Sequence, residues 1–206
     1  HAYHRRQRQM CIRDSQDSAH TCAVLDDGTV KCWGVNGQGQ LGIGNTTTMG
    51  DTAGRMGDNL STVDLGTGRT AVDVSVGNQF SCALLDNGDV KCWGVNGQGQ
   101  LGIGTTTAMG DNANEMGDNL AAVDLGTGRT AVAIATGYWH ACAILDNGGM
   151  KCWGGNSYGQ LGIGSTTAVG DAAGEMGDNL SYTSLGTGLT PVYIDAGNAH
   201  TCAIFD

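Results

Sequence analysis

Three pairs of cysteines are the residues in this 206-residue chain whose type and spacing point most clearly to chemistry. The members of each pair are ten positions apart, and the pairs are Cys22 and Cys32, Cys82 and Cys92, and Cys142 and Cys152. Such thiols can form disulfides, bind zinc or fill a core in the reduced state. No C-x2-C spacing and no second pair of ligands accompanies them, so we favour disulfides over core thiols and zinc.

Acidic side chains recur in a segment that follows each cysteine pair. The segment is rich in Gly, Asp and Asn, as in TTTAMGDNANEMGDNL at 105–120. Its carboxylates could bind calcium, meet a protein partner or cap their own turns. We favour capping, because the spacing is not that of an EF-hand and Asp and Asn commonly bond nearby backbone. The recurring residues are Asp51, Asp58, Asp111, Glu115, Asp118, Asp171, Glu175 and Asp178.

No catalytic constellation can be assembled from the remaining residues. His20, His140 and His200 share one repeated position, but the second copy has Phe80 there, which indicates packing or a turn contact. The Gly-rich WGVNGQGQLGIG lacks the Lys-Ser/Thr of a phosphate-binding loop, so its glycines are assigned to left-handed turns and close packing. We therefore predict no catalytic residue, no metal centre and no cofactor, with calcium as the alternative that stays open.

The elements that must position these residues repeat every 60 residues. CALLDNGDVKCWGVNGQGQLGIG at 82–104 returns with few changes at 22–44 and at 142–164. The repeats are therefore 22–81, 82–141 and 142–201, with the start of a fourth at 202. A fixed period of this size is typical of solenoids, propellers and arrays.

Four short β-prone runs fill each period, for example 121–126, 131–136, 141–146 and 149–154. Gly, Asn and Asp bound the runs, which is typical of antiparallel strands joined by tight turns. No segment has the sustained apolar spacing of a helix, so helices should be minor. Four strands per regular unit predict an all-β propeller with four-stranded antiparallel blades.

The turn between the cysteines decides which residues face each other. A three-residue loop, Asp86-Asn87-Gly88 with Gly88 in the left-handed conformation, sets Cys82 opposite Cys92. A two-residue Asn-Gly loop would set Cys82 opposite Trp93 instead. In every complete copy a second cysteine follows the first by ten residues, which favours the first register. In this register the opposed Cβ atoms are about 4.5–5.5 Å apart, a separation that approaches disulfide geometry. Gly28, Gly88 and Gly148 are thus predicted to be structural, and the bridges imply an oxidising compartment.

Charge restricts the classes of partner. The chain has a net charge of −10, and from Gln16 onward it has six Lys and Arg against 19 Asp and Glu. A surface this acidic repels phosphate groups, which argues against bare nucleic acid and anionic membrane and leaves a basic protein face open. No apolar run is long enough to span a membrane.

The line H-x-C-A-[LI]-L-D-[ND]-G-x-[VM]-K-C-W-G-x-N-x-x-G-Q-L-G-I-G resembles the regulator of chromosome condensation repeat family over essentially all of 17–206. The core of the motif, from Trp93 to Gly102 and in its copies, is highly specific. The resemblance implies a propeller of seven blades, of which these repeats would form an open arc of about three. The paired cysteines look like the secreted bacterial branch, which implies an extracellular, periplasmic or cell-surface location.

Trp33, Trp93 and Trp153 recur on a strand beside a glycine, so we predict that they pack between blades in equivalent buried places. The ultraviolet-sensing members of the family use clustered tryptophans, but Trp139 is the one further tryptophan of this chain. The resemblance implies a non-catalytic scaffold that binds proteins. Two alternatives are a propeller-type enzyme inhibitor and a guanine-nucleotide exchange factor for a small GTPase. The exchange factor would need an aperiodic insertion to serve as a wedge, and a cytosolic exchange factor fits the cysteine pairs poorly.

Residues 1–16, HAYHRRQRQMCIRDSQ, fall outside the repeat, and we interpret them as a sequence artefact or a disordered basic arm. The propeller repeats then occupy 17–206. Cys11 lies in the foreign segment, and Cys202 has no partner ten positions further on, so both are expected to be free thiols. An array of about half a propeller has unpaired edge strands at both of its ends. We therefore expect this fragment to self-associate.

Overall fold

Ten β-strands make up the regular structure of residues 19–206, the part of the chain that the computed structural model describes. The strands are β1 (His20–Val24), β2 (Val30–Gly34), β3 (Ala71–Val76), β4 (Phe80–Leu85), β5 (Val90–Gly94), β6 (Ala131–Thr136), β7 (His140–Leu145), β8 (Met150–Gly154), β9 (Pro191–Ala196) and β10 (Thr201–Phe205). Three single 3-10 turns accompany them: η1 (Gly57–Asn59), η2 (Gly117–Asn119) and η3 (Gly177–Asn179). The prediction of an all-β chain with minor helices is confirmed. The segment 1–16, with Cys11, lies outside the described residues.

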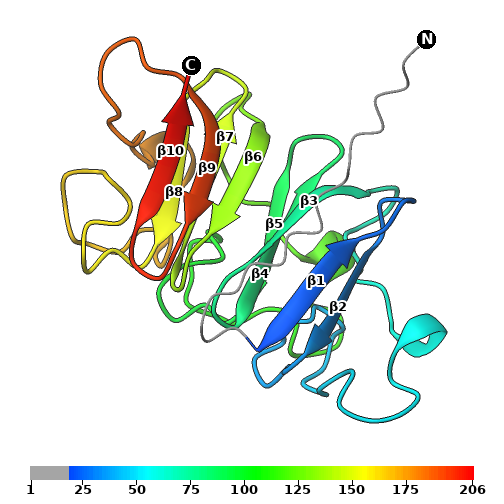
Figure 1. Cartoon of the computed structure of the whole chain (residues 1–206). Helices are drawn as coiled ribbons and strands as arrows, with labels where there is room; N and C mark the ends of the chain where they lie inside the picture. The colour runs from blue at the N-terminus through cyan, green and yellow to red at the C-terminus, as the bar shows by residue number, and fades with distance from the viewer. Residues whose placement is uncertain (1–18) are drawn as a thin grey trace, which may run out of the picture.

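Consecutive strands pair into four antiparallel sheets, which we call blades one to four. Blade one is β1-β2, blade two is β3-β4-β5, blade three is β6-β7-β8 and blade four is β9-β10. The first strands of successive blades are neighbours, with β3 beside β6 and β6 beside β9. In Figure 1 the blades follow one another along an arc, with β1-β2 at one end and β9-β10 at the other. The predicted open arc of antiparallel propeller blades is confirmed.

The strands of blade three show how closely local patterns locate the elements. The runs predicted at 131–136, 141–146 and 149–154 are observed as β6, β7 and β8, each within one residue at either end. These runs alternate β-branched or apolar residues with small ones, and Gly or Asn ends each run. Local turn chemistry is therefore sufficient to divide the repeat into its hairpins.

The fourth strand predicted in each period is replaced by a single contact. The run at 121–126 meets β5 through one backbone bond, from Val123 N to Val90 O at 2.8 Å. Shortly afterwards Gly126 N donates to Asp124 Oδ1 at 2.9 Å, which closes a local turn. The run leaves the sheet before a ladder can form, so a complete blade has three strands and one bridging segment.

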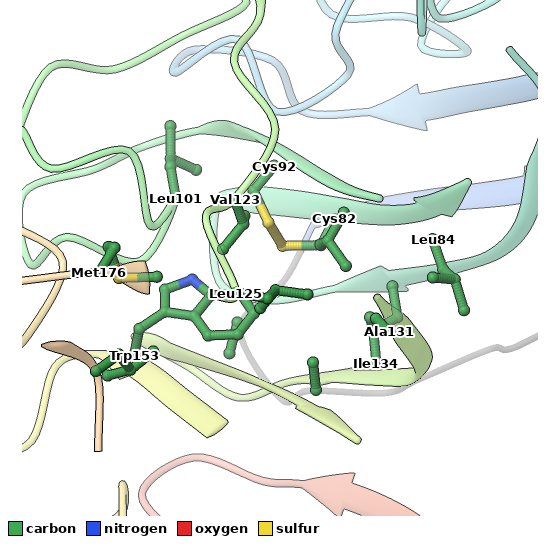
Figure 2. Packing of buried hydrophobic residues seen from close by; sticks show 14 of the residues in the cluster. Cys82, Leu84, Cys92, Leu101, Val123, Leu125, Ala131, Ile134, Trp153 and Met176 are labelled. Carbon is green, nitrogen blue, oxygen red and sulfur yellow. A yellow bond between two sulfur atoms is a disulfide. The ribbon is translucent and has the colours of Figure 1, made fainter. Parts of the chain in front are cut away.

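Apolar side chains fill the spaces between neighbouring blades. One cluster joins blades two and three and includes Phe80, Leu101, Ile134 and Trp153. A second cluster joins blades one and two around Trp93. Figure 2 shows the first of these, with Trp153, Leu101 and Met176 labelled. Since each core is shared by two sheets, a blade depends on its neighbours for stability.

Candidate functional site

The cysteines face each other across the hairpins in the register that the three-residue loop predicts. Cys22 lies opposite Cys32, Cys82 opposite Cys92 and Cys142 opposite Cys152. The paired sulfurs are 2.05, 2.11 and 2.12 Å apart, which is disulfide distance. All six side chains are buried, and Figure 2 shows the pair Cys82 and Cys92 inside the core. This geometry suits a structural bridge, because buried sulfurs are poorly accessible to a reductant.

Glycine takes the left-handed conformation at each of these turns. Gly28, Gly88 and Gly148 have φ of +80°, +83° and +75°. Leu85 N donates to Asp89 O at 2.8 Å, which closes the loop in the predicted register. A Cβ on Gly88 would lie 2.6 Å from the Cβ of Thr130, so space as well as φ requires glycine here.

Two of the three recurring tryptophans bind the preceding blade. Trp93 and Trp153 are fully buried, and their Nε1 atoms donate to Gln40 O at 3.0 Å and to Gln100 O at 3.1 Å. A Cβ on Gly102 would lie 2.7 Å from Nε1 of Trp153, so this glycine makes room for the ring. Trp33 departs from the prediction of equivalent buried places. It is half-buried, because no earlier blade covers it within residues 19–206.

A recurring lysine makes a contact that sequence patterns alone do not reveal. Lys91 Nζ donates to Leu65 O at 3.1 Å and to Gly117 O at 2.8 Å. Lys151 makes the same two contacts in the next blade. Burying an ammonium group is costly unless it is hydrogen-bonded, and the two carbonyls accept two of its three N–H donors. The sequence feature that could have indicated this contact is the Lys that stands directly before the second cysteine in all three copies.

The distal carboxylates of the acidic segment bind a threonine of the preceding blade. Thr67 donates from N and Oγ1 to the carboxylate of Asp118 at 2.8 and 2.6 Å. Thr127 and Asp178 repeat the pair at 2.9 and 2.6 Å. The bonds from the threonine hydroxyl and amide lower the pKa of both carboxyl groups. These aspartates therefore act as caps between blades.

The glutamate of the acidic segment holds its own loop together. Glu115 Oε2 accepts bonds from Gly110 N at 2.9 Å and from Asn112 N at 3.0 Å. Burial favours its protonated form, but the bonds from Asn112 outweigh that effect and lower the pKa of Glu115. Burial, followed by the nearby Glu115 carboxyl, raises the pKa of Asp111. Glu175 and Asp171 form the corresponding pair in blade three.

The first copy of the acidic segment has an ion pair at this place. Arg55 stands where the later copies have glutamate, and its Nη1 lies 3.1 Å from Asp51 Oδ1 and 2.8 Å from Thr48 O. Asp58 is exposed. No three His, Cys, Asp or Glu side chains lie close enough to hold a metal ion anywhere in the described part of the chain. The contacts of the acidic segment favour the capping interpretation.

The histidines of blades one and three also bond the following blade. His20 Nε2 lies 2.8 Å from Ser81 Oγ, and His140 Nε2 lies 2.9 Å from Thr201 Oγ1. Burial lowers the pKa of both imidazoles to about 4, so both are neutral at pH 7. Their contacts are those of packing residues, in line with Phe80 at the same place in blade two.

A cavity of about 410 Å³ lies between blades three and four. Gln160, Gly162 and Thr201 are among the residues that line it. Gln160 and Gly162 correspond to Gln100 and Gly102, which hold Trp153. Part of the cavity lining thus repeats the residues that hold Trp153 between blades two and three.

The loops at one end of the strands form a surface that we call the amide face. It comprises 35–40, 77–79, 95–100, 137–139, 155–160 and 197–199, rich in Asn, Gln and Gly. These loops share one end because each precedes the middle strand of a blade or follows the antiparallel strand beside it. Aromatic rings interrupt the amides on blade three. Tyr158 is 81% exposed, and the rings of Tyr138 and Trp139 meet edge to face at 4.8 Å.

Comparison with known proteins identifies the repeat. The model of the regulator of chromosome condensation (RCC1) repeat matches residues 18–40, 71–100 and 131–160. The human E3 ubiquitin-protein ligase HERC2 is 34% identical over 151 residues, which cover 73% of this chain and 3% of HERC2. Human HERC6, a probable E3 ubiquitin-protein ligase, is 31% identical over 186 residues, which cover 90% of this chain and 16% of HERC6. The chain therefore spans less than a fifth of these relatives.

A solved structure shows the same fold. Prp20p from Saccharomyces cerevisiae superposes with a TM-score of 0.67 at 16% sequence identity, over 92% of this chain and 42% of Prp20p. In the part of the chain described here, no helix is long and apolar enough to cross a membrane.

Proposed function

Because the chain belongs to the regulator of chromosome condensation repeat family, we propose that it is a non-catalytic propeller scaffold that binds a protein partner. The observation that carries this proposal is the structural use of the recurring polar residues. Lys91, Asp118 and His20 each bond a neighbouring blade. Groups that could perform acid–base chemistry are thus engaged in holding blades together, and the exposed loops present the binding surface.

The class of ligand is supported by a protein of the same fold. The structure of Prp20p was described together with the binding of Prp20p to Gsp1p and histones. Rigid blades with exposed loops suit such a role, since the strands hold the loop positions and the loops vary in sequence. A protein partner is therefore the favoured ligand class for this chain.

The cysteine pairs support an extracellular, periplasmic or cell-surface location. Three buried pairs at disulfide distance would form and persist in an oxidising compartment, whereas cytosolic thiols are kept reduced. An extracytoplasmic binding scaffold accounts for these pairs.

Affinity capture tests the proposal. The oxidised, tagged chain is incubated with extracellular or periplasmic extract and in parallel with cytosolic extract, and the tag alone serves as control. We expect one protein to be enriched in stoichiometric amount from the extracytoplasmic extract. A nucleotide-release assay with small GTPases runs alongside, and accelerated release would contradict the proposal in favour of an exchange factor. Chemical conversion of the captured protein would contradict the non-catalytic role.

A further inference from the structure

Blade three breaks the 60-residue repeat on the amide face. In a repeat protein the positions that maintain the fold recur, so exposed positions that depart from the period are candidates for binding. Three positions in blade three change from amides to aromatic residues relative to blade two. The replacements are Tyr138 for Asn78, Trp139 for Gln79 and Tyr158 for Gln98.

A fourth departure lies beside one of these aromatic residues. Gly155 stands where blade two has Val95. A Cβ on Gly155 would lie 3.0 Å from the Cβ of Trp139, so a valine here would press on the tryptophan. Gly155 N also donates to Trp139 O at 2.7 Å, which joins the loops 137–139 and 155–160. Val95 N makes the same bond to Gln79 O at 2.9 Å in blade two, so this junction belongs to the repeat and the aromatic side chains are what blade three adds to it.

The exposure of these rings separates them from the tryptophans of the core. Trp93 and Trp153 are fully buried and bonded to the preceding blade. Trp139 is half-buried and Tyr158 is 81% exposed. Exposed Tyr and Trp side chains are enriched where proteins bind other proteins, because they offer a large rigid contact with a polar end. We call Tyr138, Trp139 and Tyr158 the aromatic cluster.

Asp171 is the acidic residue that backbone contacts place near the aromatic cluster. Gln98 lies beside Gly155, and the next residue, Gly99, packs against the backbone of Asp171. The basic groups of blade three are turned away. Lys151 is buried with its Nζ on two carbonyls, and Arg129 pairs with Asp146 at the other end of the strands. With a net charge of −10, the chain as a whole attracts cationic partners, and neither Lys151 nor Arg129 opposes them at this face.

We propose that the aromatic cluster is the contact site for a Lys- and Arg-rich segment of a partner protein, whose cationic groups stack on the exposed rings. A guanidinium or ammonium group over a Tyr or Trp ring is attracted by the ring electrons, and arginine stacks best because its group is planar. The negative net charge attracts the cationic segment at long range, and stacking on the aromatic rings gives the contact its specificity. This inference rests on the proposed role as a protein-binding scaffold and names the site and the partner chemistry.

The repeat supplies variants that should keep the fold. Tyr138→Asn, Trp139→Gln, Tyr158→Gln and Gly155→Val together restore the residues of blade two, so each new side chain already occupies the equivalent place. None of the four substitutions changes charge, so long-range attraction stays constant. Tyr193→Ala is the matched control, because Tyr193 is 53% exposed on β9 and blade three has Ala133 at its equivalent.

The probes are labelled peptides of eight arginines and of eight glutamines, and a neutral glucan oligosaccharide. Fluorescence anisotropy measures the peptide affinities, and calorimetry measures the oligosaccharide. We expect saturable binding of the arginine peptide, weakened about tenfold or more in the combined variant and unchanged in Tyr193→Ala. Unfolding temperature and circular dichroism of the variants should match those of the parent chain.

Three results would overturn the inference. Equal affinity of the parent chain and the combined variant for the arginine peptide would show that net charge alone is responsible. Oligosaccharide binding that the combined variant loses, without arginine-peptide binding, would assign the rings to a glycan. If the combined variant still captures the same protein from extract as the parent chain, the scaffold proposal stands and the site assignment fails.

Discussion

Single side chains connect each blade to the next. Trp93 donates to a carbonyl of blade one, and Lys91 donates to Leu65 O of the same blade. Asp118 accepts from Thr67, again one blade back. The same contacts recur 60 residues later, so a variant in one blade can be compared with the equivalent variant in the next blade. Their loss should therefore be felt as a loss of stability, not of binding.

We expect Trp153→Ala to lower the free energy of unfolding by about 3–5 kcal/mol. The substitution removes a fully buried indole and leaves Gln100 O without its donor. Trp33→Ala is the control, because Trp33 is half-buried and should cost clearly less. Urea unfolding followed by circular dichroism measures both. Equal losses for the two variants would contradict the packing role between blades.

Stability should fall as the pH is lowered from about 6.5 to about 4. Burial, aided at His140 by the neighbouring His200, lowers the imidazole pKa of His20 and His140 to about 4, whereas an unfolded histidine has a pKa of about 6.5. Within this window the unfolded chain binds more protons, so acid favours unfolding; above it these groups have no effect. His140→Phe, which copies Phe80, should flatten the dependence of the unfolding free energy on pH. An unchanged slope between pH 6.5 and 4 would rule out this origin.

At the scale of elements, the hairpins could be predicted and the contacts between them could not. The Asp86-Asn87-Gly88 turn determines the register of its own strands, because a left-handed glycine sets the loop length. The acceptor of Lys91 lies 26 residues away in another blade. Its position depends on the twist between sheets, which no local pattern encodes. The fourth strand was expected from β-propensity at 121–126, but the run makes one backbone bond to β5 and no ladder.

The cysteine hairpins are the elements whose covalent state can be tested. In denatured, unreduced protein from an oxidising host, we expect Cys202, which is exposed, to react with a thiol reagent together with Cys11. The six paired cysteines should react after reduction, and each bridge lost should cost about 3 kcal/mol of stability. Eight reactive thiols before reduction would contradict the pairing and would remove the support for an oxidising compartment.

At the scale of the whole molecule, the 206-residue chain is expected to associate. Within the described residues β1 pairs only with β2 and β10 only with β9, so both end blades present strand edges. The cavity of about 410 Å³ beside blade four, lined by polar and apolar residues in about equal share, adds surface that a second chain can cover. Light scattering over a dilution series measures this association. A stable monomer at every concentration would show that the arc caps its own ends.

The most direct test of the central claim is a calorimetric titration of the oxidised chain with the purified protein that affinity capture recovers. A non-catalytic scaffold predicts saturable binding with a fixed stoichiometry, and mass spectrometry should find both proteins chemically unchanged after prolonged incubation. The opposite result, a modified partner or no saturable binding, would contradict the scaffold role.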